Sequence, residues 1–160
     1  MKFSKVMALA GVTLLASGVL AACSGSSAKG EKTFSYTYET DPDNLNYLTT
    51  GKAATSNITS NVIDGLMEND RYGNFVPSMA EDWSVSQDGL TYTYTIRKDA
   101  KWYTSEGEEY AAVKAQDFVT GLKYAADNKS EALYLVQESI KGLDAYVKGE
   151  VKDFSEVGIK

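Results

Sequence analysis

Few residues of this 160-residue chain could carry out catalysis, because it has one cysteine and no histidine. Without an imidazole there is no Ser-His or Cys-His pair and no histidine ligand for zinc. The single cysteine, Cys23, can form neither an internal disulfide nor a four-thiolate site. The sequence also lacks an obvious nucleophile elbow. The composition therefore argues against an enzyme, including a secreted hydrolase.

Glu106, Glu108 and Glu109 are carboxylates whose proximity in sequence could suggest a divalent-ion site. They lack the spaced Asp and Asn residues of an EF-hand loop, however. A short run of charge without such a pattern is typical of a solvated surface. We therefore predict no metal ion and no other cofactor for this chain.

Cys23 follows a segment with the features of a secretory signal peptide. Lys2 and Lys5 precede an uncharged apolar stretch, residues 6–20, which is too short to span a bilayer as a stable helix. The sequence Leu-Ala-Ala-Cys that ends at Cys23 is similar to the lipobox of bacterial lipoproteins, whose cysteine takes a diacylglyceryl group and becomes the mature N-terminus. We predict a lipoprotein signal peptide over residues 1–22 and a lipid anchor on Cys23. An ordinary cleavage site or a core cysteine is the alternative.

Residues 24–32 are rich in Gly and Ser, a composition typical of flexible linkers. We expect a lipid-anchored tether over residues 23–32 and a folded body over residues 33–160.

Removing residues 1–22 takes away two lysines and no acidic residue, so the net charge falls from -6 to -8. This acidity argues against nucleic acid as a partner, because phosphate binding needs clustered Lys and Arg.

Alternating side chains predict two strands in the body. Residues 33–38 and 91–96 alternate large apolar with small polar residues, the pattern of a half-buried strand. The Asp88-Gly89 pair favours a hairpin turn before the second strand.

We expect a short helical turn over residues 78–83. Two further expectations are that Trp83 and Trp102 lie in the core and that Arg97 pairs with a carboxylate.

Apolar residues at helical spacing predict three helices, over residues 54–67, 115–128 and 132–147. Gly142 is a potential break in the third helix. Residues 157–160 have the pattern of the opening of a strand, with nothing after it to pair with. We therefore expect this chain to be the N-terminal part of a longer protein.

Six stretches of the body together resemble one known family. Their order and spacing agree from about residue 33 to residue 160. The stretches are DNLN at 43–46, NVIDGLMEND at 61–70, GNFVPSMAEDW at 73–83, DGLTYTYTIR at 88–97, AKW at 100–102 and AQDFV at 115–119. With the lipobox-like sequence, they are most similar to the oligopeptide-binding lipoproteins of Gram-positive bacteria, the extracellular solute-binding proteins of family 5 that serve ABC importers.

The resemblance implies an α/β fold class, as part of a two-lobed, periplasmic-binding-protein-like fold of type II. In this family the lobes close over the ligand, and the peptide binders carry an additional small domain. This chain would supply the first strands of one lobe and much of the small domain. Two features depart from the family pattern. The turn after Trp102 is longer, over residues 103–109, and the larger C-terminal part is missing.

The implied function is the capture of extracellular oligopeptides by the lipid-anchored binding component of an ABC importer, on the extracellular face of the cell membrane. Its partners would be oligopeptides, the membrane permease and separate ATPase subunits, since the sequence lacks the ATP-binding pattern Gly-x-x-x-x-Gly-Lys-Ser/Thr. Two alternatives stay open. One is a peptide-sensing or adhesive surface lipoprotein on the same scaffold, and the other is a truncated remnant that does not bind.

The resemblance also implies residues that contact the peptide. Members of the family pair the backbone of an extended peptide with strands of the protein. One ligand-lining stretch falls on Gly51, Lys52 and Ala53, whose backbone groups would pair with the peptide; an ordinary loop before the helix is the alternative. A ligand-facing tyrosine falls on Tyr134, for which a core position is the alternative. The sequence leaves both pairs of alternatives open.

Overall fold

The computed structural model describes residues 35–37 and 40–160. The chain divides into two units, Met1–Thr37 and Tyr38–Lys160. The predicted signal peptide, Cys23 and the predicted tether all lie outside the described residues. The strand predicted over residues 33–38 is described only at residues 35–37, which lie in neither a helix nor a strand. For these three residues the strand prediction is wrong.

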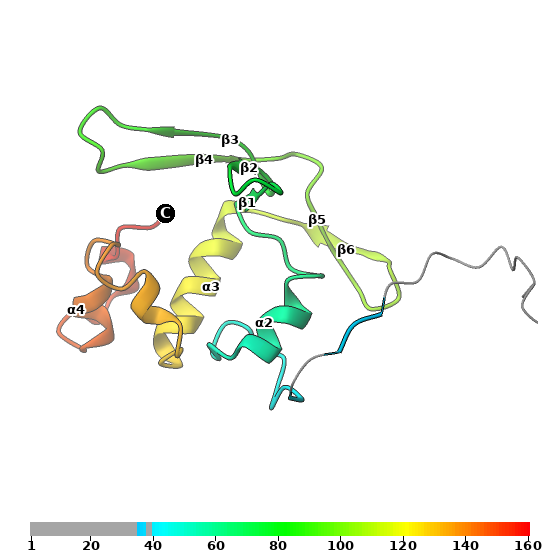
Figure 1. The fold of residues 1–160 in the computed structure, drawn as a ribbon. Helices are drawn as coiled ribbons and strands as arrows, with labels where there is room; N and C mark the ends of the chain where they lie inside the picture. The colour runs from blue at the N-terminus through cyan, green and yellow to red at the C-terminus, as the bar shows by residue number, and fades with distance from the viewer. Residues whose placement is uncertain (1–34, 38–39) are drawn as a thin grey trace, which may run out of the picture. The chain divides into compact units, whose positions relative to one another are not determined.

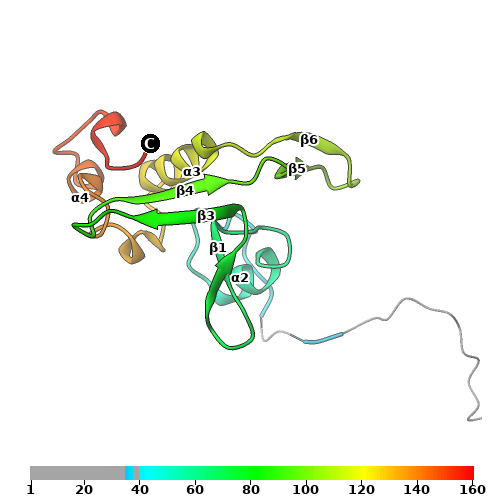
Figure 2. The same cartoon turned by 90° about the horizontal axis from the view of Figure 1, so that it is seen from above.

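The second unit mixes helices and antiparallel strands (Figure 1), which confirms the predicted α/β class. The strands form three separate hairpins, β1 with β2, β3 with β4 and β5 with β6 (Figure 2). The elements, with η for 3-10 helices, are α2 (Ala53–Thr59), β1 (Met67–Asn69), β2 (Phe75–Pro77), β3 (Ala80–Val85), β4 (Tyr92–Ile96), β5 (Lys101–Tyr103), β6 (Glu109–Ala112), α3 (Ala115–Asp127), η1 (Leu133–Leu135), α4 (Leu143–Val147) and η2 (Phe154–Glu156).

The β3–β4 hairpin confirms the predicted turn and strand. Gly89 has a φ of +72°, and the Asp88 carboxylate accepts a hydrogen bond from the Leu90 N–H at 3.1 Å. The helical turn expected over residues 78–83 is wrong, because most of that segment belongs to β3. Trp83 pairs with Tyr94 across the hairpin, and this cross-strand pairing outweighs the weak local preference for a turn.

Both tryptophans are more exposed than expected. Trp83 is 40% exposed and Trp102 is 39% exposed, so the prediction of core positions is wrong. Trp102 nevertheless connects two elements, because its indole N–H donates to Asp117 at 2.9 Å and Asp117 also accepts from the Lys114 N–H at the start of α3. The hydrogen bond from Trp102, followed by that from Lys114, holds the pKa of Asp117 below its usual range.

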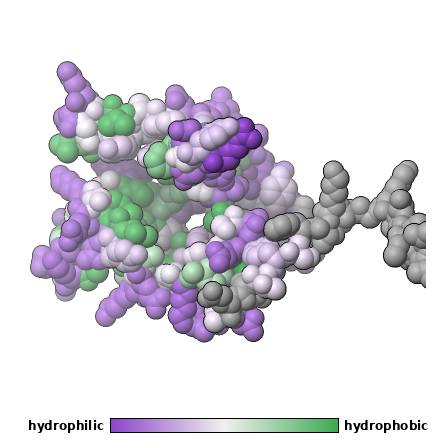
Figure 3. All heavy atoms as spheres, viewed as in Figure 1, coloured by the Kyte–Doolittle hydropathy of each residue, from purple (hydrophilic) through white to green (hydrophobic). Residues whose placement is uncertain are grey.

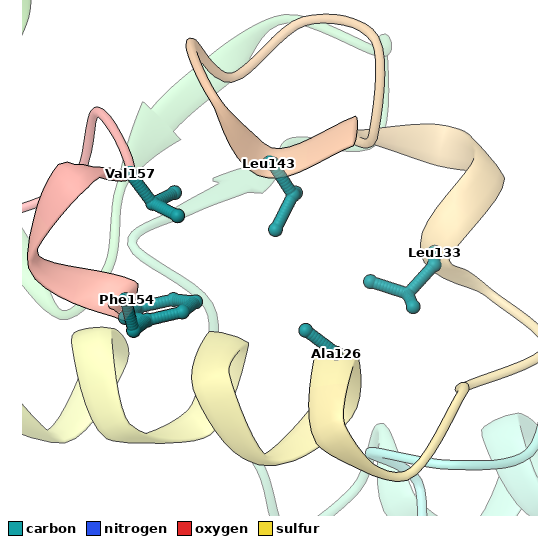
Figure 4. Packing of buried hydrophobic residues seen from close by; sticks show 5 residues of the cluster. All are labelled: Ala126, Leu133, Leu143, Phe154 and Val157. Atoms are coloured by element: carbon teal, nitrogen blue, oxygen red, sulfur yellow. The ribbon is translucent and has the colours of Figure 1, made fainter. Parts of the chain in front are cut away.

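The core lies where α3 meets the C-terminal segments (Figure 4). Helix α3 confirms the helix predicted over residues 115–128. The buried cluster of this core comprises Ala126, Leu133, Leu143, Phe154 and Val157. The strand expected over residues 157–160 is wrong, since these residues are in no strand and Val157 is only 1% exposed in this cluster.

The helix predicted over residues 132–147 is wrong as a single helix, because the segment is divided into η1, a series of turns and α4. The break falls at Gly142, as the sequence indicated, with a φ of +76°. Leu133 and Leu143 are nevertheless buried, as expected for the apolar face of that helix. The apolar pattern therefore identified which side chains lie inside, although it did not give the conformation of the backbone.

Replacing Gly142 by alanine is expected to destabilise the protein through two effects. The left-handed conformation costs a non-glycine residue about 1 to 2 kcal/mol. A Cβ at this position would also lie 3.1 Å from the Glu156 carbonyl oxygen. Gly149→Ala is the matched control, because Gly149 has a φ of +78° but nothing within 4 Å of its Cβ position. Chemical denaturation should show a larger loss of unfolding free energy for Gly142→Ala, and equal losses would contradict the close packing at Gly142.

Helix α2 is shorter than the helix predicted over residues 54–67, since it ends at Thr59. The Asn61 side-chain amide donates to the carbonyl of Asn57 at 2.7 Å and so takes up an acceptor at the end of the helix. Val62, one of the apolar residues whose spacing predicted this helix, is 76% exposed, and Thr55 and Thr59 are buried instead. Across the described ranges, every helix is too short or too polar to cross a membrane.

Candidate functional site

The stretch Gly51, Lys52 and Ala53 leads from a buried threonine into α2. Thr50 is 9% exposed and Thr55, within the helix, is 1% exposed. The Thr55 hydroxyl donates to the carbonyl of Asn44 at 2.7 Å, which fixes the helix against the preceding loop. Lys52 is the N-cap residue of α2 and has an extended backbone, with φ of -75° and ψ of 132°. The stretch therefore passes through the extended Lys52 into the first turn of α2, with a buried threonine on either side of it.

Glu131 joins this stretch to the segment that carries Tyr134. Its carboxylate oxygen accepts hydrogen bonds from the Gly51 N–H at 3.0 Å and from the Thr50 hydroxyl at 3.3 Å. Its own N–H donates to the Thr49 carbonyl at 3.0 Å. A Cβ added to Gly51 would lie 3.5 Å from the Cβ of Glu131, so the two segments are in contact although 80 residues separate them in sequence.

Several backbone groups of the stretch already have partners within the chain. The Gly51 N–H binds Glu131, the Lys52 N–H donates to the Thr50 hydroxyl at 3.3 Å, and the Lys52 carbonyl accepts from the Ser56 N–H at 3.1 Å. Within residues 35–37 and 40–160, the Gly51 carbonyl and the Ala53 N–H form no hydrogen bond. This acceptor and this donor flank the extended Lys52, which is the arrangement of one side of a β-bridge.

The Lys52 side chain forms an ion pair with Asp43. The hydrogen bond to Asp43 raises the pKa of Lys52, and so do the charge of Asp43 and, to a smaller extent, the charge of Glu131. Both partners of the pair are more than half exposed, with side chains 54% and 64% accessible, so the pair contributes little to stability. Its main effect is to engage the ammonium group with a carboxylate of the chain itself.

Tyr134 lies in η1, three residues after Glu131, and is 76% exposed. The alternative of a core tyrosine is therefore wrong. Its neighbour Leu133 is 6% exposed and belongs to the core cluster, which fixes the position of η1. The fold thus brings the segments of all four predicted peptide-contacting residues to one region through Glu131. Sequence reasoning missed Glu131, because no local pattern distinguishes it from other surface glutamates.

The other candidate residues have structural roles on the surface. Arg97 forms two hydrogen bonds of 3.0 Å to Asp99, which confirms that it pairs with a carboxylate. Glu106, Glu108 and Glu109 are exposed, and Glu109 forms an ion pair with Lys101 at 2.7 Å. In the part of the chain that is described, no three His, Cys, Asp or Glu residues are grouped so that they could hold a metal ion.

Hydrophobic side chains also lie on the surface of the second unit (Figure 3). One group of exposed hydrophobic side chains lies on the β3–β4 hairpin. Val85 pairs with Tyr92 and Trp83 with Tyr94, so these four side chains share one face of the two strands. They are between 36% and 61% exposed.

Comparison with curated proteins shows close relatives among streptococcal binding proteins. The chain is 88% identical over 162 residues to the oligopeptide-binding protein AliA of Streptococcus pneumoniae, a match that covers 100% of this chain and 24% of AliA. It is 70% identical to the oligopeptide-binding protein SarA of Streptococcus gordonii, covering 100% of this chain and 25% of SarA. The chain therefore spans about a quarter of the length of these relatives.

Solved structures of peptide-binding proteins have a similar fold. Haemophilus influenzae OppA, in complex with the peptide RPPGFSPFR, matches with a TM-score of 0.65 and 28% identity over 75% of this chain and 23% of that structure. Listeria monocytogenes OppA bound to peptide matches with a TM-score of 0.63 and 28% identity over 72% of this chain and 22% of that structure.

A family model for the middle part of these proteins matches residues 74–157, which are 84 of the 160 residues. The match includes α3 and the whole buried cluster of the core. Together with the close relatives and the shared fold, it confirms the resemblance that the sequence stretches indicated. The chain belongs to the bacterial extracellular solute-binding proteins of family 5.

Proposed function

We propose that this chain forms one side of the peptide site in the lipid-anchored binding component of an ABC importer, which captures extracellular oligopeptides for uptake. Two findings support the proposal. AliA and SarA, which match the entire chain, are named oligopeptide-binding proteins, and the OppA structures of similar fold hold peptides. The permease and ATPase subunits of the importer would receive the peptide from the intact protein.

The observation that carries the proposal is the pair of available backbone groups around Lys52. The Gly51 carbonyl can accept from a peptide N–H, and the Ala53 N–H can donate to a peptide carbonyl. An extended peptide would thereby add to the protein as a strand does, a mode in which main-chain hydrogen bonds give affinity without reading the side chains. Exposed Tyr134 would supply an aromatic surface for the peptide near this edge.

The test is the substitution Ala53→Pro, which removes the proposed donor while preserving the helix. Ala53 is the first residue of α2, where the helix does not use the N–H and proline is well tolerated. The extended backbone of Lys52 also suits a residue that precedes proline. The change should leave a peptide carbonyl without its partner and weaken binding roughly tenfold, or about 1.4 kcal/mol.

The measurement is isothermal titration with defined tetrapeptides to octapeptides. It uses a full-length chimera in which this chain replaces the matching quarter of AliA. Ala115→Pro is the matched control, because Ala115 is the first residue of α3 and follows another extended lysine, Lys114. The control should bind as the unsubstituted chimera does. Equal affinities for the Ala53→Pro and Ala115→Pro variants would contradict a peptide contact at Ala53.

The proposal also includes the organisation of the N-terminal segment. Residues 1–22 would be removed as a lipoprotein signal peptide, residues 23–32 would form the tether, and residues 33–160 would be the N-terminal part of the binding domain. Cys23 is the proposed site of lipidation, supported by the preceding Leu-Ala-Ala sequence. The anchor would hold the protein at the extracellular face of the cell membrane, where the permease lies.

Cys23→Ala is expected to release the protein into the medium or to leave it unprocessed. A diacylglyceryl group together with an amide-linked chain supplies the two or more acyl chains that stable anchoring needs, at about 0.8 kcal/mol per buried methylene. Cell fractionation and mass spectrometry of the membrane fraction measure the result. Ser24→Ala, which alters the next residue but preserves the thiol, should remain anchored. Retention of the Cys23→Ala variant on the membrane at the normal mature mass would refute the assignment.

A further inference from the structure

We infer that Glu131 is a positioning residue for peptide binding, which holds the Gly51 carbonyl at the edge where a peptide pairs. This inference rests on the proposed function, because it assigns a role to a residue beside that site. Glu131 itself need not touch the peptide. It would act on the peptide site by holding the backbone of residues 50–52. The same hydrogen bonds join this backbone to the segment that carries Tyr134, three residues further along the chain.

The first part of the argument is the geometry of the carboxylate. One oxygen of Glu131 accepts from both the Gly51 N–H and the Thr50 hydroxyl, at 3.0 and 3.3 Å. The Thr50 hydroxyl in turn accepts from the Lys52 N–H at 3.3 Å. Hydrogen bonds to an ionised acceptor are stronger than those between neutral groups. A single side chain therefore orients the peptide units on the N-terminal side of Lys52.

The second part is that Glu131 is itself held in place. The preceding residue, Ser130, is 8% exposed, and its N–H donates to the Ala125 carbonyl at the end of α3 at 2.9 Å. The Glu131 N–H donates to the Thr49 carbonyl. The backbone of Glu131 is thus fixed next to the end of α3. Its carboxylate therefore holds residues 50–52 at a defined position relative to that helix.

The third part is that Gly51 needs such a constraint. Glycine has the largest backbone freedom of any residue, so a glycine at a binding edge loses more entropy on ordering. A hydrogen bond that orders Gly51 before the peptide arrives removes part of this cost from binding. The same bond also occupies the Gly51 N–H. It therefore determines which backbone groups of the stretch remain for the peptide.

The experiment compares Glu131→Ala and Glu131→Gln in the full-length chimera with AliA. Alanine removes the acceptor, whereas glutamine retains an oxygen that can accept from the Gly51 N–H. We expect Glu131→Ala to weaken peptide binding by roughly fivefold to tenfold, or about 1 to 1.4 kcal/mol. Glu131→Gln should restore most of that loss. Glu138→Ala is the control for the removal of an exposed glutamate on the same segment.

A second measurement does not depend on peptide binding. Hydrogen–deuterium exchange of the segment that contains Gly51, measured without peptide, should become faster in Glu131→Ala and remain unchanged in Glu138→Ala. If the unsubstituted chimera binds no peptide, the proposed function fails while the exchange result still tests the contact. If peptide binding is intact but Glu131→Ala matches Glu138→Ala in affinity or in exchange, the role assigned to Glu131 is wrong.

Discussion

The 160-residue chain by itself is expected to bind oligopeptides more weakly than about 1 mM, a value that corresponds to -4.1 kcal/mol. The full-length chimera with AliA should bind the same peptides at about 1 μM or below, which requires about -8.2 kcal/mol. The difference would come from the three quarters of the relatives' length that this chain does not span.

The backbone contacts available on this chain explain the weak binding. Among the described residues, the Gly51 carbonyl and the Ala53 N–H have no hydrogen-bond partner and would pair with a peptide. Each hydrogen bond contributes about 0.5 to 1.5 kcal/mol net, whereas ordering each peptide residue costs about 1 to 2 kcal/mol. The contacts therefore do not exceed the cost of ordering the peptide. Exposed Tyr134 would add contact area on one side of the peptide only.

Isothermal titration of the purified chain and of the chimera with the same peptides measures this difference. The chain must be monodisperse, because the apolar face of the β3–β4 hairpin could otherwise promote association. Binding of the isolated chain at micromolar concentration or below would show that the peptide site is complete within residues 1–160.

Leu143→Ala is expected to lower the free energy of unfolding by about 2 to 5 kcal/mol, the usual cost of such a change in a core. Leu143 is 0% exposed and lies at the meeting point of α4 with the other members of the buried cluster (Figure 4). Domains of this size have only about 5 to 15 kcal/mol of stability in total. The substitution should therefore remove a large part of the stability of the second unit.

Leu135→Ala is the matched control for this prediction, because Leu135 is 65% exposed in the adjacent η1 helix. It should change the free energy of unfolding by no more than about 0.5 kcal/mol. Urea denaturation followed by circular dichroism measures both variants. Similar losses for Leu143→Ala and Leu135→Ala would mean that the buried cluster is not the core that stabilises this unit.

Local sequence patterns predicted those elements whose stability depends on near neighbours. Helix α3 lies where its apolar spacing indicated, and the Asp88-Gly89 turn joins β3 to β4. These patterns were less reliable where the backbone depends on distant contacts. The apolar spacing of residues 132–147 suits a single helix, yet Gly142 adopts a left-handed conformation against Glu156 and Val157 instead.

Exposure of aromatic residues was the property that the sequence predicted least well. Trp83 and Tyr94 alternate with polar residues as core-facing side chains do, but their shared face lies open in this chain. Alternation shows that two faces of a strand differ, and it does not show what covers the apolar face. Whether the apolar face is covered depends on other segments that pack against the hairpin. The residues of the hairpin do not specify those segments.

The sequence by itself determined the family, the α/β class and the positions of the residues proposed to contact peptide, because these depend on residue types in a fixed order along the chain. It left open whether Tyr134 is exposed and which backbone groups near Lys52 are free. Only the tertiary structure decided these points, by burying Leu133 beside the exposed Tyr134 and by placing Glu131 against Gly51 across 80 residues of sequence. A hydrogen bond between such distant segments depends on how residues 49–51 meet the segment that follows α3, and neither segment carries a local pattern that specifies it.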